Sequence, residues 1–366
     1  MAVTGAHGKT TTTAMISKIL IDAKKKPTIL IGGNYSEIDG NVKIGENNFF
    51  VTEACEYMDS FLELRPKNAV ILNIDSDHLD YFSGINQIVR SFQAFTENVQ
   101  DDGILFAYNG NVFINDILRT TKKKVITFGH NNSCDFWVEN IVFNNKGNPS
   151  FSLFAYDKKL GKINLSVPGD HNVINALAAI AVTYTLGIPL ETIKKTLKSF
   201  KGVARRAEKK GETKEGVYLI DDYAHHPTEI EATIKAIKNI PHEKLWVIFQ
   251  PHTYTRTLAL YKDFAKKLSK ADNLILAKIY AAREQNLNNI TSEIIYDELP
   301  EKYKNGKAIY LDSFEKIATY IKKNAKKGDI VLTLSAGSLP DVCDLILGEF
   351  DDKETIETLR AVKIND

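Results

Sequence analysis

The chain has few cysteines, no excess of either charge and no long apolar run. Its 366 residues include three widely separated cysteines, Cys55, Cys134 and Cys343, which show no metal-ligand spacing. The 47 basic and 46 acidic side chains leave a formal net charge of +1, which gives no electrostatic case for nucleic acid or an anionic membrane. No apolar stretch approaches the roughly 18 residues of a membrane span, and no secretory signal pattern is visible. We therefore expect a cytoplasmic protein that binds neither nucleic acid nor membrane.

Short β-rich runs alternate with longer helical patterns in the first half of the chain. Strands are expected at 49–55, 68–74, 103–108 and 124–128, and helices at 9–24, 84–99 and 170–186. This alternation predicts βαβ units and a mostly parallel sheet. The segment 135–166 differs, because Asn/Gly turns between its apolar runs favour antiparallel strands.

A second alternation follows a charged stretch at 201–216, whose low apolar content is typical of a domain junction. Its strands are expected at 217–221, 244–249, 273–279, 307–311 and 329–334. The predicted fold class is therefore α/β with two domains. A central P-loop-type domain with a mostly parallel sheet is expected over 1–200, a smaller Rossmann-like α/β domain over 201–350, and a polar tail over 351–366.

The stretch Gly5-Ala6-His7-Gly8-Lys9-Thr10 has the composition of a phosphate-binding loop. It follows a short apolar strand and opens a helical pattern, so backbone N–H groups and the helix N-terminus can face a phosphate. Lys9 could reach the β- and γ-phosphates of a nucleotide, and the Thr10 hydroxyl could ligate Mg²⁺. Two residues separate the glycines, fewer than in the common P-loop. The alternative is a glycine-rich turn before a Thr run that starts the helix.

Acidic side chains and a histidine follow two other predicted strands. Glu53 ends the first run, and the second ends in a polar segment containing Asp75, Asp77, His78 and Asp80. In open α/β sheets ligands bind at the carboxyl ends of strands, so we expect Glu53 and His78 near the loop. Both could complete the coordination of a divalent cation held by Thr10. The alternative is that each side chain caps a turn or lies in solvent.

Polar side chains also gather at the starts of three further helical patterns. His171, Asn172 and Asn175 open an Ala-rich helix, where they could recognise an adenine edge or where Asp170 or Asn172 could cap the helix. Two strand-to-helix turns in the second half of the chain carry Asp221, Asp222, Tyr223, His225 and His226 in one case, and Gln250, His252, Tyr254 and Arg256 in the other. The paired histidines could suggest zinc, but no third ligand lies at helical spacing.

Seven motifs of the chain occur in the order found in the Mur ligase family, which the sequence resembles from residue 2 to about residue 347. They are "AVTGAHGKTTTT", "VTEACEY", "NIDSDHLDYF", "PGDHNVINALAA", "DDYAHHPTEI", "FQPHTYTRT" and "IYAARE". The resemblance implies an ATP-dependent amide ligase of peptidoglycan synthesis. In such an enzyme ATP phosphorylates the lactyl carboxylate of UDP-N-acetylmuramate, and L-alanine attacks the acyl phosphate. The protein then contributes positioning and charge stabilisation.

The resemblance also implies roles for residues that match these motifs. Gly5, Gly8, Lys9, Thr10 and Thr11 would bind the phosphates of ATP, and Thr10, Glu53 and His78 would bind Mg²⁺. His171, Asn172 and Asn175 would meet the adenine, Arg206 the γ-phosphate and Asp222 the ribose. Tyr223, His225, His252 and Arg256 would line the substrate and amino-acid pocket. The catalytic set would be Lys9, His78, His225, His252 and Arg256.

The chain departs from the family pattern at several places. Ala207 stands where the family has an aromatic residue, Thr253 where Arg is frequent, and "LTLSAGSLPDV" where a Gly-Ala-Gly-Asp run is usual. Only Met1 to Thr4 precede the loop, and no UDP-binding domain comes before them, so we expect an N-terminally truncated ligase. Two alternatives are a relative that adds a peptide in murein recycling, and an ATP-binding subunit that needs a separate UDP-binding chain.

Overall fold

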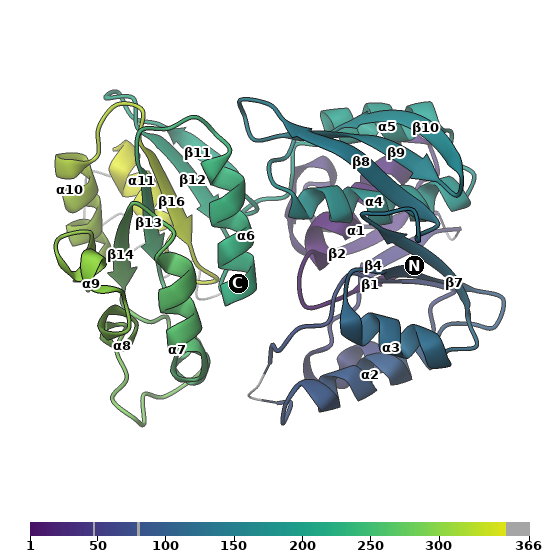
Figure 1. The fold of residues 1–366 in the computed structure, drawn as a ribbon, viewed down its shortest axis with the longest axis horizontal. Helices are drawn as coiled ribbons and strands as arrows, with labels where there is room; N and C mark the ends of the chain where they lie inside the picture. Colours follow the sequence, from purple (N-terminus) through teal and green to yellow (C-terminus); the bar gives the residue numbers. More distant parts are fainter. Residues whose placement is uncertain (47, 79–80, 349–366) are drawn as a thin grey trace. The chain divides into compact units, whose positions relative to one another are not determined.

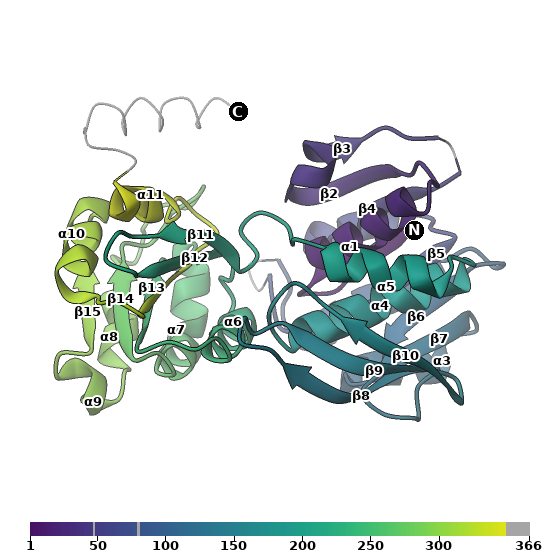
Figure 2. The same cartoon turned by 90° about the horizontal axis from the view of Figure 1, so that it is seen from above.

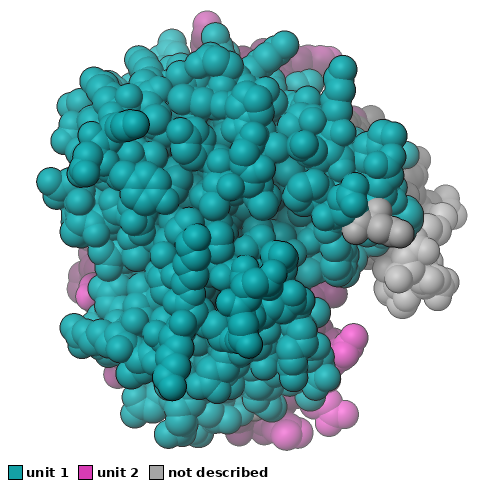
Figure 3. Space-filling view, turned by 90° about the vertical axis from the view of Figure 1, so that its right-hand side faces the viewer, with its two compact units in different colours: residues 1–204, 235–240 teal, residues 205–234, 241–366 magenta. Residues whose placement is uncertain are grey.

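The computed structural model describes residues 1–46, 48–78 and 81–348, so Asp80 and the predicted tail 351–366 lie outside the described residues. The chain divides into two compact units, residues 1–204 with 235–240 and residues 205–234 with 241–366, which are coloured separately in Figure 3. Each unit contains its own sheet. None of the helices in the described ranges is both long and apolar enough to span a bilayer. The predicted α/β class, with a large mostly parallel sheet and a second, smaller sheet domain, is confirmed.

The first unit is built on a ten-stranded sheet in the order β10-β9-β8-β7-β6-β5-β1-β4-β2-β3. Its strands are β1 (Ala2–Thr4), β2 (Thr28–Tyr35), β3 (Gly40–Lys43), β4 (Phe50–Glu53), β5 (Asn68–Ile71), β6 (Ile104–Tyr108), β7 (Lys124–Gly129), β8 (Phe136–Phe143), β9 (Pro149–Ala155) and β10 (Lys158–Asn164). Neighbours from β2 to β8 pair in parallel, whereas β3, β9 and β10 pair antiparallel at the two edges. The antiparallel strands predicted within 135–166 are therefore confirmed.

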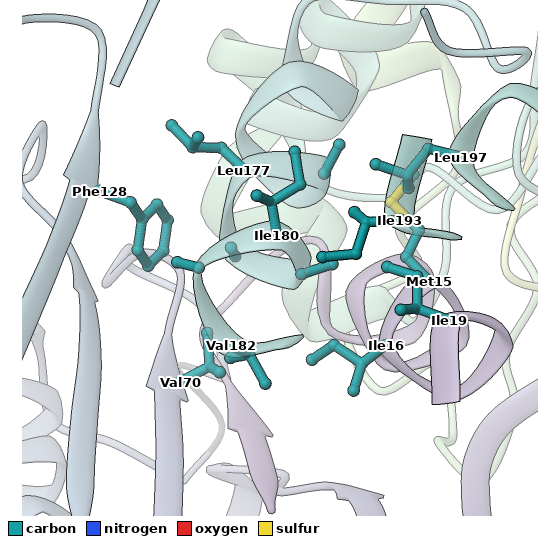
Figure 4. Close-up of a cluster of buried hydrophobic side chains, with 14 of the residues drawn as sticks. Met15, Ile16, Ile19, Val70, Phe128, Leu177, Ile180, Val182, Ile193 and Leu197 are labelled. Atoms are coloured by element: carbon teal, nitrogen blue, oxygen red, sulfur yellow. The ribbon is translucent and has the colours of Figure 1, made fainter. Parts of the chain in front are cut away.

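Helices cover both faces of this sheet (Figures 1 and 2). The helices on one face are α1 (Lys9–Asp22), α4 (His171–Thr185) and α5 (Leu190–Ser199), and those on the other are the 3₁₀ segment η2 (Tyr57–Glu63), α2 (Ile85–Glu97) and α3 (Val112–Thr120). Figure 4 shows side chains of α1, α4 and α5 packed together, among them Ile16, Ile180 and Leu197. The buried alanines of α4 allow this close approach, and packing outweighs the poor helix propensity of the Thr run in α1.

The central position of β1 brings distant segments together at one sheet edge. β1 pairs in parallel with β4 on one side and with β5 on the other. The carboxyl ends of the three strands therefore point the same way. As a result, the loop after β1 lies between the segment that follows Glu53 and the segment that follows Ile71.

The second unit contains a six-stranded sheet in the order β11-β12-β16-β13-β14-β15. Its strands are β11 (Glu208–Glu212), β12 (Tyr218–Asp222), β13 (Leu245–Phe249), β14 (Asn273–Ala277), β15 (Ala308–Leu311) and β16 (Ile330–Leu334). Among the described residues after 226, the helices are α6 (Pro227–Lys238), α7 (Tyr254–Leu268), α8 (Glu293–Asp297), α9 (Glu301–Lys304), α10 (Phe314–Asn324) and α11 (Asp341–Leu347). All strand pairs are parallel except β11 with β12. Because β16 lies between β12 and β13, its carboxyl end adjoins both predicted strand-to-helix turns.

The charged stretch 201–216, interpreted from the sequence as a domain junction, contains a strand that the sequence analysis did not predict. Residues 208–212 form β11, an edge strand that pairs with β12. The Lys209 ammonium lies 5.0 Å from the centre of the Tyr218 ring, where it covers apolar surface. Charged side chains are common on edge strands because one side of the strand faces solvent.

Candidate functional site

The loop after β1 makes two close approaches that only glycine permits. Gly5 has φ +138°, and a Cβ atom there would lie 3.0 Å from the backbone nitrogen of Asn73. Gly8 has φ +86°, and a Cβ atom there would lie 2.5 Å from Oδ1 of Asn175. The loop is therefore packed against the end of β5 on one side and against the first turns of α4 on the other.

Asn73 fixes the loop from the side of β5. Its Oδ1 accepts a hydrogen bond from the backbone N–H of His7 at 2.8 Å, and its Nδ2 donates to the His7 carbonyl at 2.9 Å. Nε2 of the His7 ring lies 3.1 Å from Oδ2 of Asp75. Sequence reasoning selected Asp75 but not Asn73, although the place of Asn73 just after the strand was a usable signal.

Two carboxylates at the end of β4 contact Lys9 and Thr10. The Thr10 hydroxyl donates to Oε2 of Glu53 at 3.1 Å, and Oε1 of Glu53 accepts from the Gly32 N–H at 2.6 Å. Nζ of Lys9 lies 3.1 and 2.9 Å from the two carboxylate oxygens of Glu56. Burial lowers the pKa of Lys9, but the charge of Glu56, its hydrogen bond to Lys9 and the charges of Cys55 and Glu53 together outweigh this effect, so the pKa is raised.

The predicted metal ligands fall into two groups in the structure. Thr10 and Glu53 are in contact, and their hydroxyl and carboxylate oxygens are ligands that suit Mg²⁺. Nε2 of His78 lies 3.9 Å from Oε1 of Glu56, and the His78 ring lies 4.7 Å from that of Tyr57. Glu56 was missed by sequence reasoning. Its position three residues after Glu53, in the same segment beyond the strand, was the available signal.

The start of α4 supports the loop through Asn175. Nδ2 of Asn172 donates to the Pro168 carbonyl at 2.7 Å, and Nδ2 of Asn175 donates to Oδ1 of Asn172 at 3.0 Å. Both asparagines are buried, whereas His171 is exposed. Within the described residues the Asp170 side chain makes no capping hydrogen bond, so the capping explanation for this segment is not supported.

In the second unit the predicted pocket residues contact one another. The ring centres of Tyr223 and His225 are 5.5 Å apart, and those of His225 and His252 are 5.9 Å apart. Nη1 of Arg256 donates to Nδ1 of His252 at 3.1 Å, which places any proton of a neutral His252 on Nε2. The ring centre of Tyr280 also lies 5.7 Å from that of His252. Four side chains from two turns thus form one polar aromatic cluster.

Arg205 and Arg206 flank Tyr223 and differ in their partners. Both guanidinium groups lie near the Tyr223 ring, at 4.9 Å for Arg205 and 5.1 Å for Arg206. Arg205 also donates to Oδ2 of Asp221 at 3.1 Å and to the Ser335 carbonyl at 2.6 Å. Arg205 is therefore held by two hydrogen bonds in addition to its contact with the Tyr223 ring.

Asp222 braces the backbone on both sides of this cluster. Its carboxylate accepts from the N–H of Ala207 at 2.7 Å and from the N–H of Ala224 at 2.8 Å. Burial raises the pKa of Asp222 to about 6, against the opposing influence of Arg206 and of the two N–H groups. This bracing is a structural role that the sequence reading, which assigned Asp222 to a ribose, did not foresee.

The residues that depart from the family pattern have local partners. The Thr253 hydroxyl accepts from the Arg256 N–H at 3.4 Å and caps α7. The Ser335 hydroxyl donates to Oε1 of Gln250 at 2.9 Å and accepts from the Gly337 N–H at 2.7 Å. Ser335 follows β16 and Gln250 follows β13, so this bond ties the central strand to the turn that carries His252. An open pocket of ≈ 380 Å³, lined in part by Gln250 and Tyr280, lies at the same edge.

Comparisons with known proteins match both units to one family. The Mur ligase middle domain matches residues 3–183, and the Mur ligase glutamate ligase domain matches residues 205–337. The UDP-N-acetylmuramate--L-alanine ligase of Caldanaerobacter subterraneus subsp. tengcongensis is 46% identical over 350 residues, which are 95% of this chain and 75% of that protein.

Solved structures with the same fold include two ligases. The UDP-N-acetylmuramate-alanine ligase MurC of Thermotoga maritima is 28% identical with a TM-score of 0.79, covering 95% of this chain and 74% of that one. A murein peptide ligase of Psychrobacter arcticus is 27% identical with a TM-score of 0.69, covering 95% of this chain and 76% of that one.

Proposed function

The chain belongs to the Mur ligase family, and we propose that it joins L-alanine to the lactyl carboxylate of UDP-N-acetylmuramate at the expense of ATP. The observation that carries the proposal is the loop Gly5–Thr10, held between two strand ends with Lys9 and Thr10 against carboxylates. Use of a nucleotide and a nucleotide sugar implies a cytoplasmic reaction.

The first proposed step is phosphoryl transfer from ATP to the lactyl carboxylate. A carboxylate oxygen attacks the γ-phosphorus, the bond to the bridging oxygen breaks, and ADP leaves with that electron pair. Lys9 donates to the β- and γ-phosphate oxygens as their charge is redistributed. Gly5 and Gly8 allow the backbone N–H groups to approach the phosphates, and Thr11 lies behind them in the first turn of α1.

Thr10 and Glu53 are the residues that would hold Mg²⁺. Their side-chain oxygens already meet at 3.1 Å, and oxygen ligands of this kind fit the ion. When bound, the ion would neutralise charge on the transferring phosphoryl group. We also assign His78 to this site. It lies at the periphery of the site, because the carboxylate nearest to it among the described residues is that of Glu56 and not that of Glu53.

The second proposed step is attack of the L-alanine amine on the acyl phosphate. The amine nitrogen bonds to the carbonyl carbon, phosphate leaves with the electron pair of the C–O bond, and the nitrogen loses a proton. We assign recognition of the amino-acid carboxylate to Arg256 and the proton to the pair His225 and His252. Tyr223 and Arg206 would border the same pocket, Arg206 toward the γ-phosphate. Asp222 near the ribose, and His171, Asn172 and Asn175 near the adenine, complete the proposal.

A substrate panel tests the choice of acceptor. Purified protein is incubated with MgATP, UDP-N-acetylmuramate and either L-alanine, glycine, L-serine or a murein tripeptide, and the nucleotide product is identified by mass spectrometry. We expect the L-alanine adduct with equal amounts of ADP and phosphate. A preference for the tripeptide would instead support the murein-recycling alternative, which the 46% identity to an L-alanine ligase does not favour. A UDP-binding partner in the purified material would support the subunit alternative.

A further inference from the structure

Glu56 holds the ammonium group that the proposed function assigns to ATP. Both of its oxygens lie within hydrogen-bonding distance of Nζ of Lys9, at 3.1 and 2.9 Å. The same nitrogen donates to the carbonyl of Gly5 at 2.6 Å and approaches that of Ala6 at 3.3 Å. An ammonium group has three protons to donate, so in this arrangement Lys9 has none left for a phosphate.

The Glu56 side chain is almost completely buried, with 3% of its surface exposed. A buried carboxylate that loses its cation is costly unless another positive group replaces it. Nε2 of His78 lies 3.9 Å from Oε1 of Glu56. Thr10, the residue that follows Lys9, donates to Glu53. Glu56 therefore contacts the loop lysine directly and approaches His78, one of the residues assigned to the cation.

We propose that Glu56 is a positioning residue that occupies Lys9 in the nucleotide-free protein and releases it to the phosphates only when a divalent cation arrives with the nucleotide. The inference rests on the proposed function, because it takes Lys9 as the phosphate ligand. Without the cation, the nucleotide would draw Lys9 away and place its own negative charge beside an uncompensated Glu56. With the cation, the freed carboxylate faces positive charge. Glu56 thereby makes ATP binding depend on the cation.

Calorimetric ATP binding with and without Mg²⁺ tests this dependence. The native chain is titrated with ATP in MgCl₂ and in EDTA, and the ratio of the two Kd values is compared with that of Glu56→Gln. Gln has the same shape as Glu but no charge. Mg-free ATP should therefore bind to Glu56→Gln about tenfold more tightly than to the native chain, as expected for roughly 1.4 kcal/mol less repulsion. The Kd for MgATP should change less than about threefold, roughly half of that free energy. Glu63→Gln, an exposed change at the end of η2, is the matched control and should leave both values unaltered.

The outcomes separate this inference from the proposed function. If native protein fails to bind MgATP, the proposed function is wrong. If it binds MgATP but Glu56→Gln weakens both affinities together, or leaves their ratio unchanged, Glu56 is merely structural and the inference is overturned.

A structure of the native chain with Mg²⁺ and a non-hydrolysable ATP analogue provides a test that needs no variant. We expect Nζ of Lys9 to contact a phosphate oxygen and to lie farther from both Glu56 oxygens than hydrogen-bonding distance. An unbroken contact between Lys9 and both Glu56 oxygens in that complex would overturn the inference even if Glu56→Gln does not fold.

Discussion

Lys9 is the side chain on which the assignment of the nucleotide depends most directly. Charge-assisted hydrogen bonds to phosphate are among the strong ones, so we expect Lys9→Ala to weaken MgATP binding by about a hundredfold, near 3 kcal/mol. The Lys9→Ala change also leaves the buried Glu56 carboxylate without its lysine partner, so the thermal stability of the variant must be measured alongside the calorimetry. Lys25→Ala, an exposed change beyond α1, is the control. Equal MgATP affinity in the Lys9 variant and the native chain would refute the phosphate-loop assignment.

Asp222 makes a prediction about the pH dependence of stability. Its pKa rises from 3.8 to about 6 on folding, so between these values the native state binds more protons than the unfolded state. The contribution of this carboxyl to the free energy of unfolding must therefore fall as pH rises through the window, by roughly 3 kcal/mol in total.

Denaturant unfolding of the native chain and of Asp222→Asn measures this effect. The stability of the native chain relative to the variant should decline from about pH 4 to about pH 6 and level off above. A relative stability that rises with pH over this range would mean that the carboxylate is stabilised, not penalised, by its site. A carbon NMR titration of the Asp222 carboxyl provides an independent reading of the pKa.

Local sequence signals predicted some site residues and not others, for a physical reason. Lys9 and Thr10 belong to one contiguous motif, and Glu53 ends an apolar run. The local sequence was therefore enough to predict these three as site residues. Glu56 and Asn73 act through contacts with residues 47 and 66 positions away, which sequence spacing does not encode. The contacts of Glu56 and Asn73 with the loop follow from the order of β4, β1 and β5 in the sheet, which only the structure gives.

At the scale of elements, the turn from β1 into α1 is fixed by glycine. Gly8 and Gly187 have similar φ values of +86° and +79°, but a Cβ at Gly187 would meet nothing within 4 Å among the described residues. Gly187→Ala should therefore cost only backbone strain of about 1 kcal/mol. Gly8→Ala should cost about 1–3 kcal/mol more, because the new methyl group would collide with Asn175.

Chemical unfolding of the two alanine variants measures this difference, and MgATP calorimetry should detect a loss only for Gly8→Ala. Adding Asn175→Ala to Gly8→Ala should restore part of the stability, since it removes the collision. If both single variants lose the same stability, the close approach of the loop to α4 does not constrain Gly8.

Elements with continuous helix-like or strand-like runs were predicted within a few residues, whereas strands that contain glycine or polar residues were missed. The helices α1, α2 and α4 and the parallel strands from β4 to β7 lie where alternation placed them. β2 contains Gly32 and Gly33, which weaken a strand pattern, and β3 and β11 are polar edge strands. Main-chain pairing with a neighbour, not side-chain burial, makes the polar edge strands regular.

At the scale of the molecule, the two units are expected to perform separable tasks. The phosphate loop belongs to the first unit and the cluster around His252 and Arg256 to the second. We expect Arg256→Ala to leave the Kd for MgATP within about threefold of the native value and to lower the rate of amide formation by about 10²-fold or more. Arg119→Ala, an exposed change on α3, should alter neither quantity. A comparable loss of nucleotide affinity in Arg256→Ala would contradict this division.

Activation of the lactyl carboxylate by ATP can be tested by following one oxygen atom. UDP-N-acetylmuramate labelled with ¹⁸O in its lactyl carboxylate is incubated with the purified protein, MgATP and L-alanine, and the released phosphate is analysed by mass spectrometry. An acyl phosphate intermediate requires one carboxylate oxygen to leave with the phosphate, so we predict one ¹⁸O atom in each phosphate formed with product. Product accompanied by unlabelled phosphate would contradict activation of the carboxylate by ATP, and with it the proposed ligase reaction.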